Sequence, residues 1–107
     1  MDIYCVGDSI TRGGNDTEAG DWVNRLKVGC GEEARVINLG VGGETTRKMR
    51  LRLATDLKSR LRAGVRSLVT LGYGANDAAG SGGQFLVPVE EYVENLSWAI
   101  DQAQQLG

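Results

Sequence analysis

Three short apolar segments predict the β-strands of this protein. They contain Val, Ile or Leu, each ends at or just before a glycine, and they occupy residues 3–7, 34–39 and 66–71. Longer segments with a helical spacing of apolar residues follow each of them. The resulting order β-α-β-α-β-α is typical of an α/β protein with a parallel sheet and right-handed crossovers.

The first helix is predicted over residues 21–30. Trp22, Leu26 and Cys30 recur every four residues, so one stripe of this helix should face a core. Gly29 and Gly31 are expected to end the helix. Polar, glycine-containing stretches predict loops at residues 12–20 and 77–86.

A long second helix is predicted over about residues 45–63. Its apolar stripe consists of Met49, Leu53, Leu57 and Leu61. Gly64 is its expected C-cap, and its many Arg and Lys residues should form a solvated face. A last helix should begin near Pro88. Its predicted apolar face consists of Val89, Tyr92, Val93, Leu96, Ala99, Ile100 and Ala103.

The composition fits one small domain that spans residues 1–107. The formal net charge is −2, which argues against a general nucleic-acid binder. No apolar run approaches the roughly 18 residues needed to cross a bilayer, and no leader-like segment follows Met1. We therefore expect a cytoplasmic protein without membrane attachment. Cys5 and Cys30 are expected to be reduced, and a sequence without histidine favours no metal site.

Candidate chemistry gathers where the predicted strands end. Gly7-Asp8-Ser9 follows the first strand, Asn38 to Thr45 spans the end of the second, and Leu71 to Asp77 spans the end of the third. Open α/β sheets place their ligands at the carboxyl ends of the strands. We expect the three loops to converge there, with the Ser9 hydroxyl and the Asn76 amide in one small cavity.

These three stretches resemble, in order, the first three signature blocks of the GDSL or SGNH serine ester hydrolases. The resemblance implies a three-layer, flavodoxin-like fold with a parallel sheet of order 2-1-3. It also implies that the chain covers about the first half of an SGNH hydrolase domain. The family's later Asp-x-x-His block is absent, and the sequence contains no histidine.

By this resemblance, Ser9 is the nucleophile that attacks an ester carbonyl. The oxyanion would be held by the N–H groups of Ser9 and Gly43 and by the side-chain amide of Asn76. Gly43 is favoured over Gly42 because an acidic residue and a threonine follow it. The supporting residues would be Asp8, Gly74 and Asp77. The same residues also suit simpler roles: a serine capping a turn, glycines in a β-to-α turn and an Asx turn at Asn76.

The resemblance implies a carboxylic ester hydrolase, lipase-like or acylhydrolase-like, that acts on a small-molecule ester without metal or cofactor. Because the histidine and aspartate of the triad are missing, we expect this chain to have little activity alone. The alternative is a non-catalytic module that binds esters or carbohydrates. A nucleotide-binding domain is disfavoured, because the loop after Val6 lacks the Gly-Lys-Ser/Thr of a P-loop.

The third strand raises a further expectation. If it lies at a sheet edge, residues 67–71 expose unpaired backbone groups that another strand could bind. The partner would be a second copy of this chain, giving a homodimer, or the missing C-terminal half of the family's domain.

Overall fold

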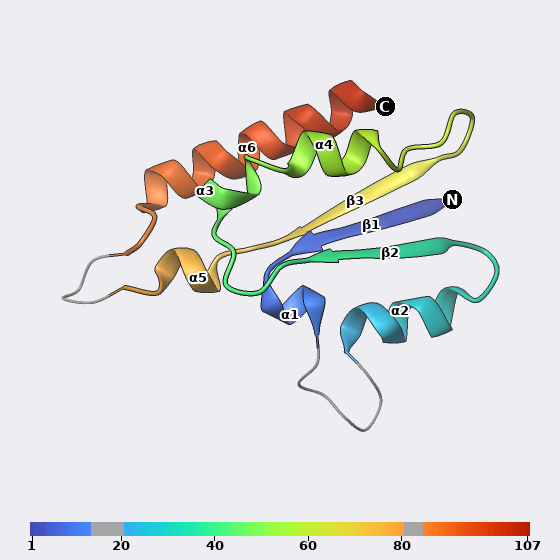
Figure 1. Cartoon of the computed structure of the whole chain (residues 1–107), viewed down its shortest axis with the longest axis horizontal. Coiled ribbons are helices and arrows are strands. Elements are labelled where there is room, and N and C mark those ends of the chain that lie inside the picture. The colour runs from blue at the N-terminus through green and yellow to red at the C-terminus, as the bar shows by residue number, and fades with distance from the viewer. Residues whose placement is uncertain (14–20, 81–84) are drawn as a thin grey trace. The chain divides into compact units, whose positions relative to one another are not determined.

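The computed structural model describes residues 1–13, 21–80 and 85–107 (Figure 1). The contacts among these residues group into two units. The first unit comprises residues 1–42 and 61–72, and the second comprises residues 43–60 and 73–107. Each unit is described by itself, and the single domain expected from the sequence stays a prediction. Most of the predicted loop at 12–20, and residues 81–84 of the loop at 77–86, lie outside the described residues.

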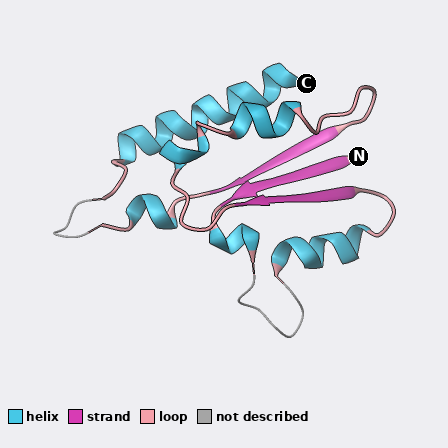
Figure 2. Cartoon of the chain, viewed as in Figure 1, coloured by secondary structure: helices cyan, strands magenta, loops and turns pink. Residues whose placement is uncertain are grey.

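Three parallel strands form the sheet of the first unit (Figure 2). They are β1 (Asp2–Gly7), β2 (Arg35–Gly40) and β3 (Ser67–Gly72), in the spatial order β2-β1-β3. This confirms the α/β class and the strand order 2-1-3, with strand bounds shifted by one residue. Gly7 is the register partner of both Gly40 and Gly72, so the three strands end level.

The core of the first unit lies between the sheet and α2 (Trp22–Cys30). Its buried members are Ile3, Cys5, Val23 and Val36, with Leu26, Cys30 and Ala34 packed against them. The predicted stripe of this helix is therefore confirmed at Leu26 and Cys30, whereas Trp22 at its first turn is 37% exposed. Cys5 and Cys30 are both free thiols.

A buried carboxylate anchors the amino end of β1. Asp2 is fully buried, and its carboxylate accepts hydrogen bonds from Arg35 (3.0 and 3.2 Å), Arg62 (2.5 and 2.8 Å) and the Tyr4 hydroxyl (3.3 Å). The guanidinium groups of Arg62 and Arg35 hold the pKa of Asp2 well below its usual range. These contacts tie three separate segments of the first unit together at one point.

The second unit contains helices only, as far as the structure describes it. They are α3 (Thr46–Met49), α4 (Leu53–Lys58), α5 (Ala75–Ala78) and α6 (Val89–Leu106). Both α3 and α4 pack against α6, and α4 and α6 lie side by side in Figure 1. None of the helices in the described ranges combines the length and apolar character that crossing a bilayer requires.

The single long helix predicted over residues 45–63 is wrong. The N–H groups of Leu51 and Arg52 bond to carbonyls three residues earlier, which tightens the chain and separates α3 from α4. Met49 and Leu53 nevertheless remain fully buried on both sides of this turn, so the four-residue repeat continues across it. Gly64 lies in a later turn, six residues beyond the end of α4 at Lys58, and caps no helix.

The last helix begins directly after Pro88, as predicted, but its predicted apolar face is partly wrong. Val89, Val93 and Ile100 are exposed, whereas Asn95 and Ala99 are buried. The amide of Asn95 donates to the Thr46 hydroxyl (3.0 Å) and accepts from Arg50 (3.0 Å). These bonds satisfy the buried polar side chain of Asn95. The buried stripe of α6 therefore includes a polar residue, which hydrophobic periodicity does not select.

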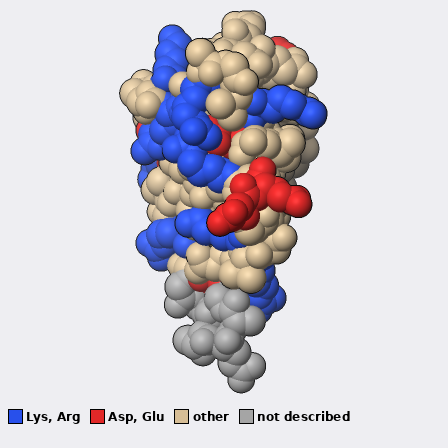
Figure 3. All heavy atoms as spheres, turned by 90° about the vertical axis from the view of Figure 1, so that its right-hand side faces the viewer, with Lys and Arg blue, Asp and Glu red and all other residues tan. Residues whose placement is uncertain are grey.

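Several basic side chains near the second predicted helix are paired with carboxylates. The pairs are Arg47 with Glu91, Arg52 with Glu44 and Asp56, Arg60 with Asp56, and Arg62 with Asp2. On the face drawn in Figure 3, acidic side chains lie among the Lys and Arg side chains. The expected solvated face is therefore largely a set of ion pairs, of which the exposed ones each contribute little to stability.

In the described sheet, β3 is an edge strand that pairs only with β1. Ser67 and Leu68 at its start are exposed. A homodimer or a second half that pairs along this edge stays a prediction.

The ion cluster at Asp2 leads to a first prediction. We expect Asp2→Asn to lower the midpoint of denaturant unfolding at pH 7, because the amide cannot form ion pairs with Arg35 and Arg62. The pKa of Asp2 is depressed in the folded chain, so its stabilisation is present above the unfolded pKa of about 4 and is lost as the pH falls below it. Denaturant titrations followed by circular dichroism should show the unfolding midpoints of the wild type and of Asp2→Asn converging between about pH 4 and 2. An equal gap at pH 7 and pH 2 would contradict this account.

The break between α3 and α4 leads to a second prediction, with two neighbouring leucines as a matched pair. Leu53 is fully buried and Leu51 is 86% exposed. Leu53→Ala should lower the free energy of unfolding by about 2–5 kcal/mol, because it leaves a cavity. Leu51→Ala should change it by no more than about 0.5 kcal/mol. Chemical denaturation measures both, and comparable losses would contradict the exposure of Leu51 in the turn between α3 and α4.

Candidate active site

Ser9 lies two residues after the end of β1, at the first position of the short helix α1 (Ser9–Arg12) in the first unit. Asp8 precedes it as the N-cap, and its buried carboxylate accepts the Ile10 N–H at 3.0 Å. The Asp8 carbonyl accepts the Arg12 N–H, and the Ser9 carbonyl accepts the Gly13 N–H, each at 2.9 Å. These bonds fix the backbone on both sides of Ser9, whose side chain is only partly buried.

The end of β2 packs tightly against α1 in the same unit. A Cβ atom at Gly40 would lie 2.1 Å from the Arg12 nitrogen, so only glycine allows this approach. Asn38 adds hydrogen bonds from its amide to the carbonyls of Thr11 (3.0 Å) and Arg12 (3.2 Å), and its oxygen accepts the Gly40 N–H (2.9 Å). Asn38 therefore holds α1 against the sheet, a role that the sequence reasoning missed although the residue opens the second motif.

Gly43 and Asn76 belong to the second unit, where the structure brings their segments together. The Asn76 amide donates a 3.1 Å hydrogen bond to the carbonyl of Glu44, the residue that follows Gly43. Gly43 has φ of +72°, a conformation that favours glycine. Gly74 is the N-cap of α5, so Asn76 lies in the first turn of that helix.

Asp77 is buried and bonded to the start of α3. Its carboxylate accepts the Thr46 N–H at 2.9 Å and also the Thr46 hydroxyl. The same hydroxyl accepts a hydrogen bond from Asn95 of α6. Asp77 thus links the third motif to the start of α3, with one hydrogen bond from Thr46 on each carboxylate oxygen.

Another buried carboxylate of the second unit, that of Glu44, was not identified from the sequence. It is 5% exposed and forms hydrogen bonds with Arg52 (2.7–3.0 Å) and with the Tyr73 hydroxyl (2.6 Å). Burial and the Glu44 carboxylate raise the pKa of Tyr73, so the hydroxyl stays protonated and remains a donor. The only available sequence signal was an acidic residue after Gly43 with an arginine eight positions later.

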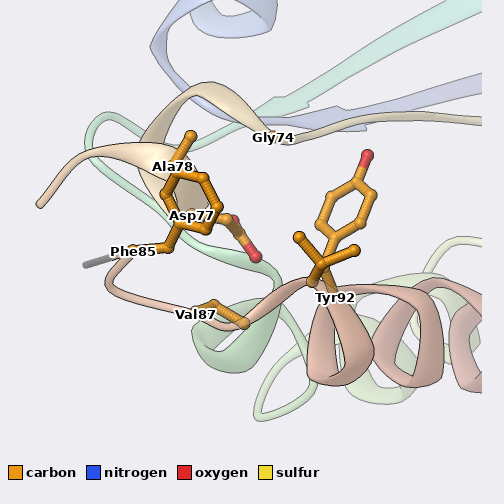
Figure 4. Close-up of a pocket in the computed structure, with 7 residues that line it drawn as sticks. Gly74, Asp77, Ala78, Phe85, Val87 and Tyr92 are labelled. Carbon is orange, nitrogen blue, oxygen red and sulfur yellow. The ribbon is translucent and has the colours of Figure 1, made fainter. Parts of the chain in front are cut away.

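A pocket of about 260 Å³ lies beside the third motif in the second unit (Figure 4). It is lined by Gly74, Asp77, Ala78, Phe85, Val87, Val89 and Tyr92. Phe85 and Ala78 lie on one side and Tyr92 on the other. The lining side chains are mostly apolar, and the one carboxylate among them already binds Thr46. The described residues contain no cluster of three or more His, Cys, Asp or Glu that could hold a metal ion.

Known SGNH hydrolases share this fold. The esterase AlinE4, of the SGNH-hydrolase family, matches with a TM-score of 0.76 and 26% identity, over 97% of this chain and 53% of its own. A member of the lipolytic G-D-S-L family from Veillonella parvula matches with a TM-score of 0.78 and 24% identity, over 99% of this chain and 54% of its own.

A family model and one sequence relative agree with this. The model of the GDSL-like lipase/acylhydrolase family matches residues 5–107, and the chain belongs to that family. The chain is also 33% identical over 112 residues to the uncharacterized lipoprotein YqeF of Bacillus subtilis, covering 99% of this chain and 44% of that protein. It spans about half the length of these relatives. Because one of them is named a lipoprotein, the cytoplasmic location stays a prediction.

The two neighbouring glycines of the second motif lead to a third prediction. Gly43→Ala should lower the free energy of unfolding by about 1–2 kcal/mol, because alanine is strained at a positive φ. Gly42→Ala should cost less than about 0.5 kcal/mol, since the new methyl group meets only the movable tip of Arg12. Thermal unfolding measures both, and equal losses would show that the backbone at Gly43 does not need glycine.

Proposed function

We propose that this chain carries the nucleophile and the oxyanion donors of a carboxylic ester hydrolase. The Ser9 Oγ attacks the ester carbonyl carbon, and its proton passes to a base. The carbon–oxygen bond to the alcohol then breaks, the alcohol leaves with a proton, and an acyl group remains on Ser9. Water hydrolyses this acyl-enzyme and restores the serine. The chemistry uses no metal or cofactor.

The observation that carries the proposal is the level end of the three strands. Gly7, Gly40 and Gly72 are register partners, and each motif leaves the sheet from one of these positions. Ser9 lies two residues after Gly7, and Asn76 lies four residues after Gly72. Loops that leave one edge of a parallel sheet at the same level are suited to build a common site.

The oxyanion donors of the proposal are the N–H groups of Ser9 and Gly43 and the side-chain amide of Asn76. The Asn76 amide has two N–H bonds, of which one is directed at the Glu44 carbonyl. The other is available to a developing negative charge. Removal of one such donor typically lowers kcat by about 10²–10³.

The base is the missing component of this chain. The 107 residues contain no histidine. An aspartate is in general a weak base for a serine proton, because an ordinary carboxyl group has a pKa near 4. In addition, the Asp8 carboxylate caps α1, and the Asp77 carboxylate binds Thr46. We infer that this chain alone has little hydrolase activity.

The proposed substrate is a small-molecule ester with a short acyl group. The pocket beside the third motif supports this, because its lining is mostly apolar and its volume of about 260 Å³ is small. Pockets for drug-sized ligands typically measure about 300–1,000 Å³. An acyl chain of a few carbons fits such a pocket better than a charged or large ligand.

A second candidate function is a binding module that holds an ester or carbohydrate without cleaving it. The absence of histidine favours it for these 107 residues. Calorimetric titration with an acetylated sugar distinguishes the two functions: a module binds it without releasing acetate, whereas an esterase releases acetate in a Ser9-dependent reaction.

The proposal gives a fourth prediction, in which free imidazole replaces the missing base. With p-nitrophenyl acetate, added imidazole should raise the rate of Ser9 acylation by part of the roughly 10²–10⁴-fold that a positioned base contributes. Intact-mass spectrometry measures the added acetyl group. Ser9→Ala should abolish the imidazole-dependent increase, whereas Ser97→Ala, at an exposed position of α6, should retain it. Equal acylation of the Ser9→Ala chain would refute the nucleophile.

A further inference from the structure

The Glu44 carboxylate is buried but has no part in the chemistry proposed above. Arg52 donates hydrogen bonds to this carboxylate from Nε and Nη2. The Tyr73 hydroxyl donates to Oε1, the oxygen that Nη2 also contacts. Arg52 is itself held by Asp56 at 2.8 Å, one turn further along α4. The carboxylate is therefore fixed in both position and rotation by donors from two separate segments.

Tyr73 is fixed at both ends. Its hydroxyl binds Glu44, and its backbone carbonyl accepts the Tyr92 hydroxyl at 3.0 Å. Tyr73 directly follows the last residue of β3 and precedes Gly74 and Asn76. The segment that carries Asn76 is thus attached to the second motif through Glu44 and to α6 through Tyr92.

The backbone of Glu44 completes the connection. Its carbonyl accepts the Asn76 amide, and its nitrogen belongs to the peptide that follows Gly43. A displacement of Glu44 would therefore move the Gly43 peptide and also remove the acceptor that orients Asn76. Both of the oxyanion donors proposed in the second unit depend on where this one residue lies.

Stability alone is a weak reason for this arrangement. Burying an ion pair costs desolvation energy that its attraction often only balances, and apolar side chains of similar size can be equally stable. Buried polar groups do, however, fix a single arrangement of the segments they join. A site that must hold two donors in place needs that property more than it needs added stability.

We propose that Glu44, Arg52 and Tyr73 form a positioning cluster that holds the Gly43 N–H and the Asn76 amide in the geometry needed to bind an oxyanion. This rests on the proposed function, because it assigns the cluster to those two donors. None of the three side chains touches the substrate in this account. Each acts through the Glu44 backbone, and Tyr73 also acts through the segment that leads to Asn76.

The experiment uses two variants that change little besides the hydrogen bonds. Tyr73→Phe removes one hydroxyl, and Glu44→Gln removes one charge. Glu91→Gln is the matched control, because it removes the charge of another Arg–Glu pair in the same unit, in which Glu91 binds Arg47 and Asn95 rather than a member of the cluster. Chemical denaturation of each variant confirms that it is folded under the assay conditions.

The first readout is the Asn76 side-chain amide in ¹⁵N-labelled full-length chain, assigned from the signals that disappear in Asn76→Ala. In wild type and in Glu91→Gln, the proton directed at the Glu44 carbonyl should be protected from exchange with water. In Tyr73→Phe and Glu44→Gln, the signals should shift and lose this protection. Unchanged Asn76 signals in both variants would overturn the positioning role, whether or not Ser9 reacts.

The second readout is imidazole-assisted acylation of Ser9 by p-nitrophenyl acetate. Tyr73→Phe should lower the rate about tenfold, a part of the roughly 10²–10³-fold that a whole oxyanion donor supplies. Most of this loss should vanish when Tyr73→Phe is made in an Asn76→Ala chain, because the hydroxyl acts through that amide. If the rate losses of Tyr73→Phe and Asn76→Ala are fully additive, the Tyr73 hydroxyl does not act through the Asn76 amide and the proposal is overturned. If Asn76→Ala alone leaves the rate unchanged, the proposed function fails, while the amide signals still decide whether the cluster positions Asn76.

Discussion

The level end of three parallel strands is the constraint on which the rest of the structure depends. Gly7 pairs in register with Gly40 on one side and with Gly72 on the other, so the chain leaves the sheet three times at one height. The close approach of α1 to Gly40 is possible only because that residue has no side chain. A register slip of one residue in any strand would turn its side chains to the opposite face and move its loop away from this height.

Polar contacts, rather than apolar ones, define the second unit near the candidate site. Asp77 binds Thr46, Thr46 binds Asn95, and Asn95 binds Arg50, so four residues from three segments form one connected path. Buried hydrogen bonds of this kind specify one arrangement and penalise others, since a lost partner leaves a buried polar group unsatisfied. The helices next to Gly43 and around Asn76, α3 and α5, have four residues each, and these hydrogen bonds join them to α6.

The sequence predicted the parts of the fold that depend on local pattern. The strands followed from short apolar runs that end at glycine, their order followed from the resemblance to the SGNH hydrolases, and the last helix followed from Pro88. The break between α3 and α4 could not be predicted, because Met49 and Leu53 keep a four-residue repeat across it. The buried positions of Glu44 and Asn95 were missed for a related reason: periodicity selects apolar residues, and these side chains are buried because of partners distant in the sequence. Membership of the family was evident from three motifs, whereas the residues that support those motifs became visible only through their contacts.

The two tryptophans fall one to each unit, Trp22 on α2 and Trp98 on α6. Trp22 is partly exposed at the start of its helix. The Arg50 Cζ atom lies over the Trp98 ring, 4.7 Å from the ring centroid. Their surroundings are chemically different, so their fluorescence should differ as well. Each unit therefore contains its own fluorescent reporter. Two single-tryptophan variants would show whether the two units unfold in one cooperative transition.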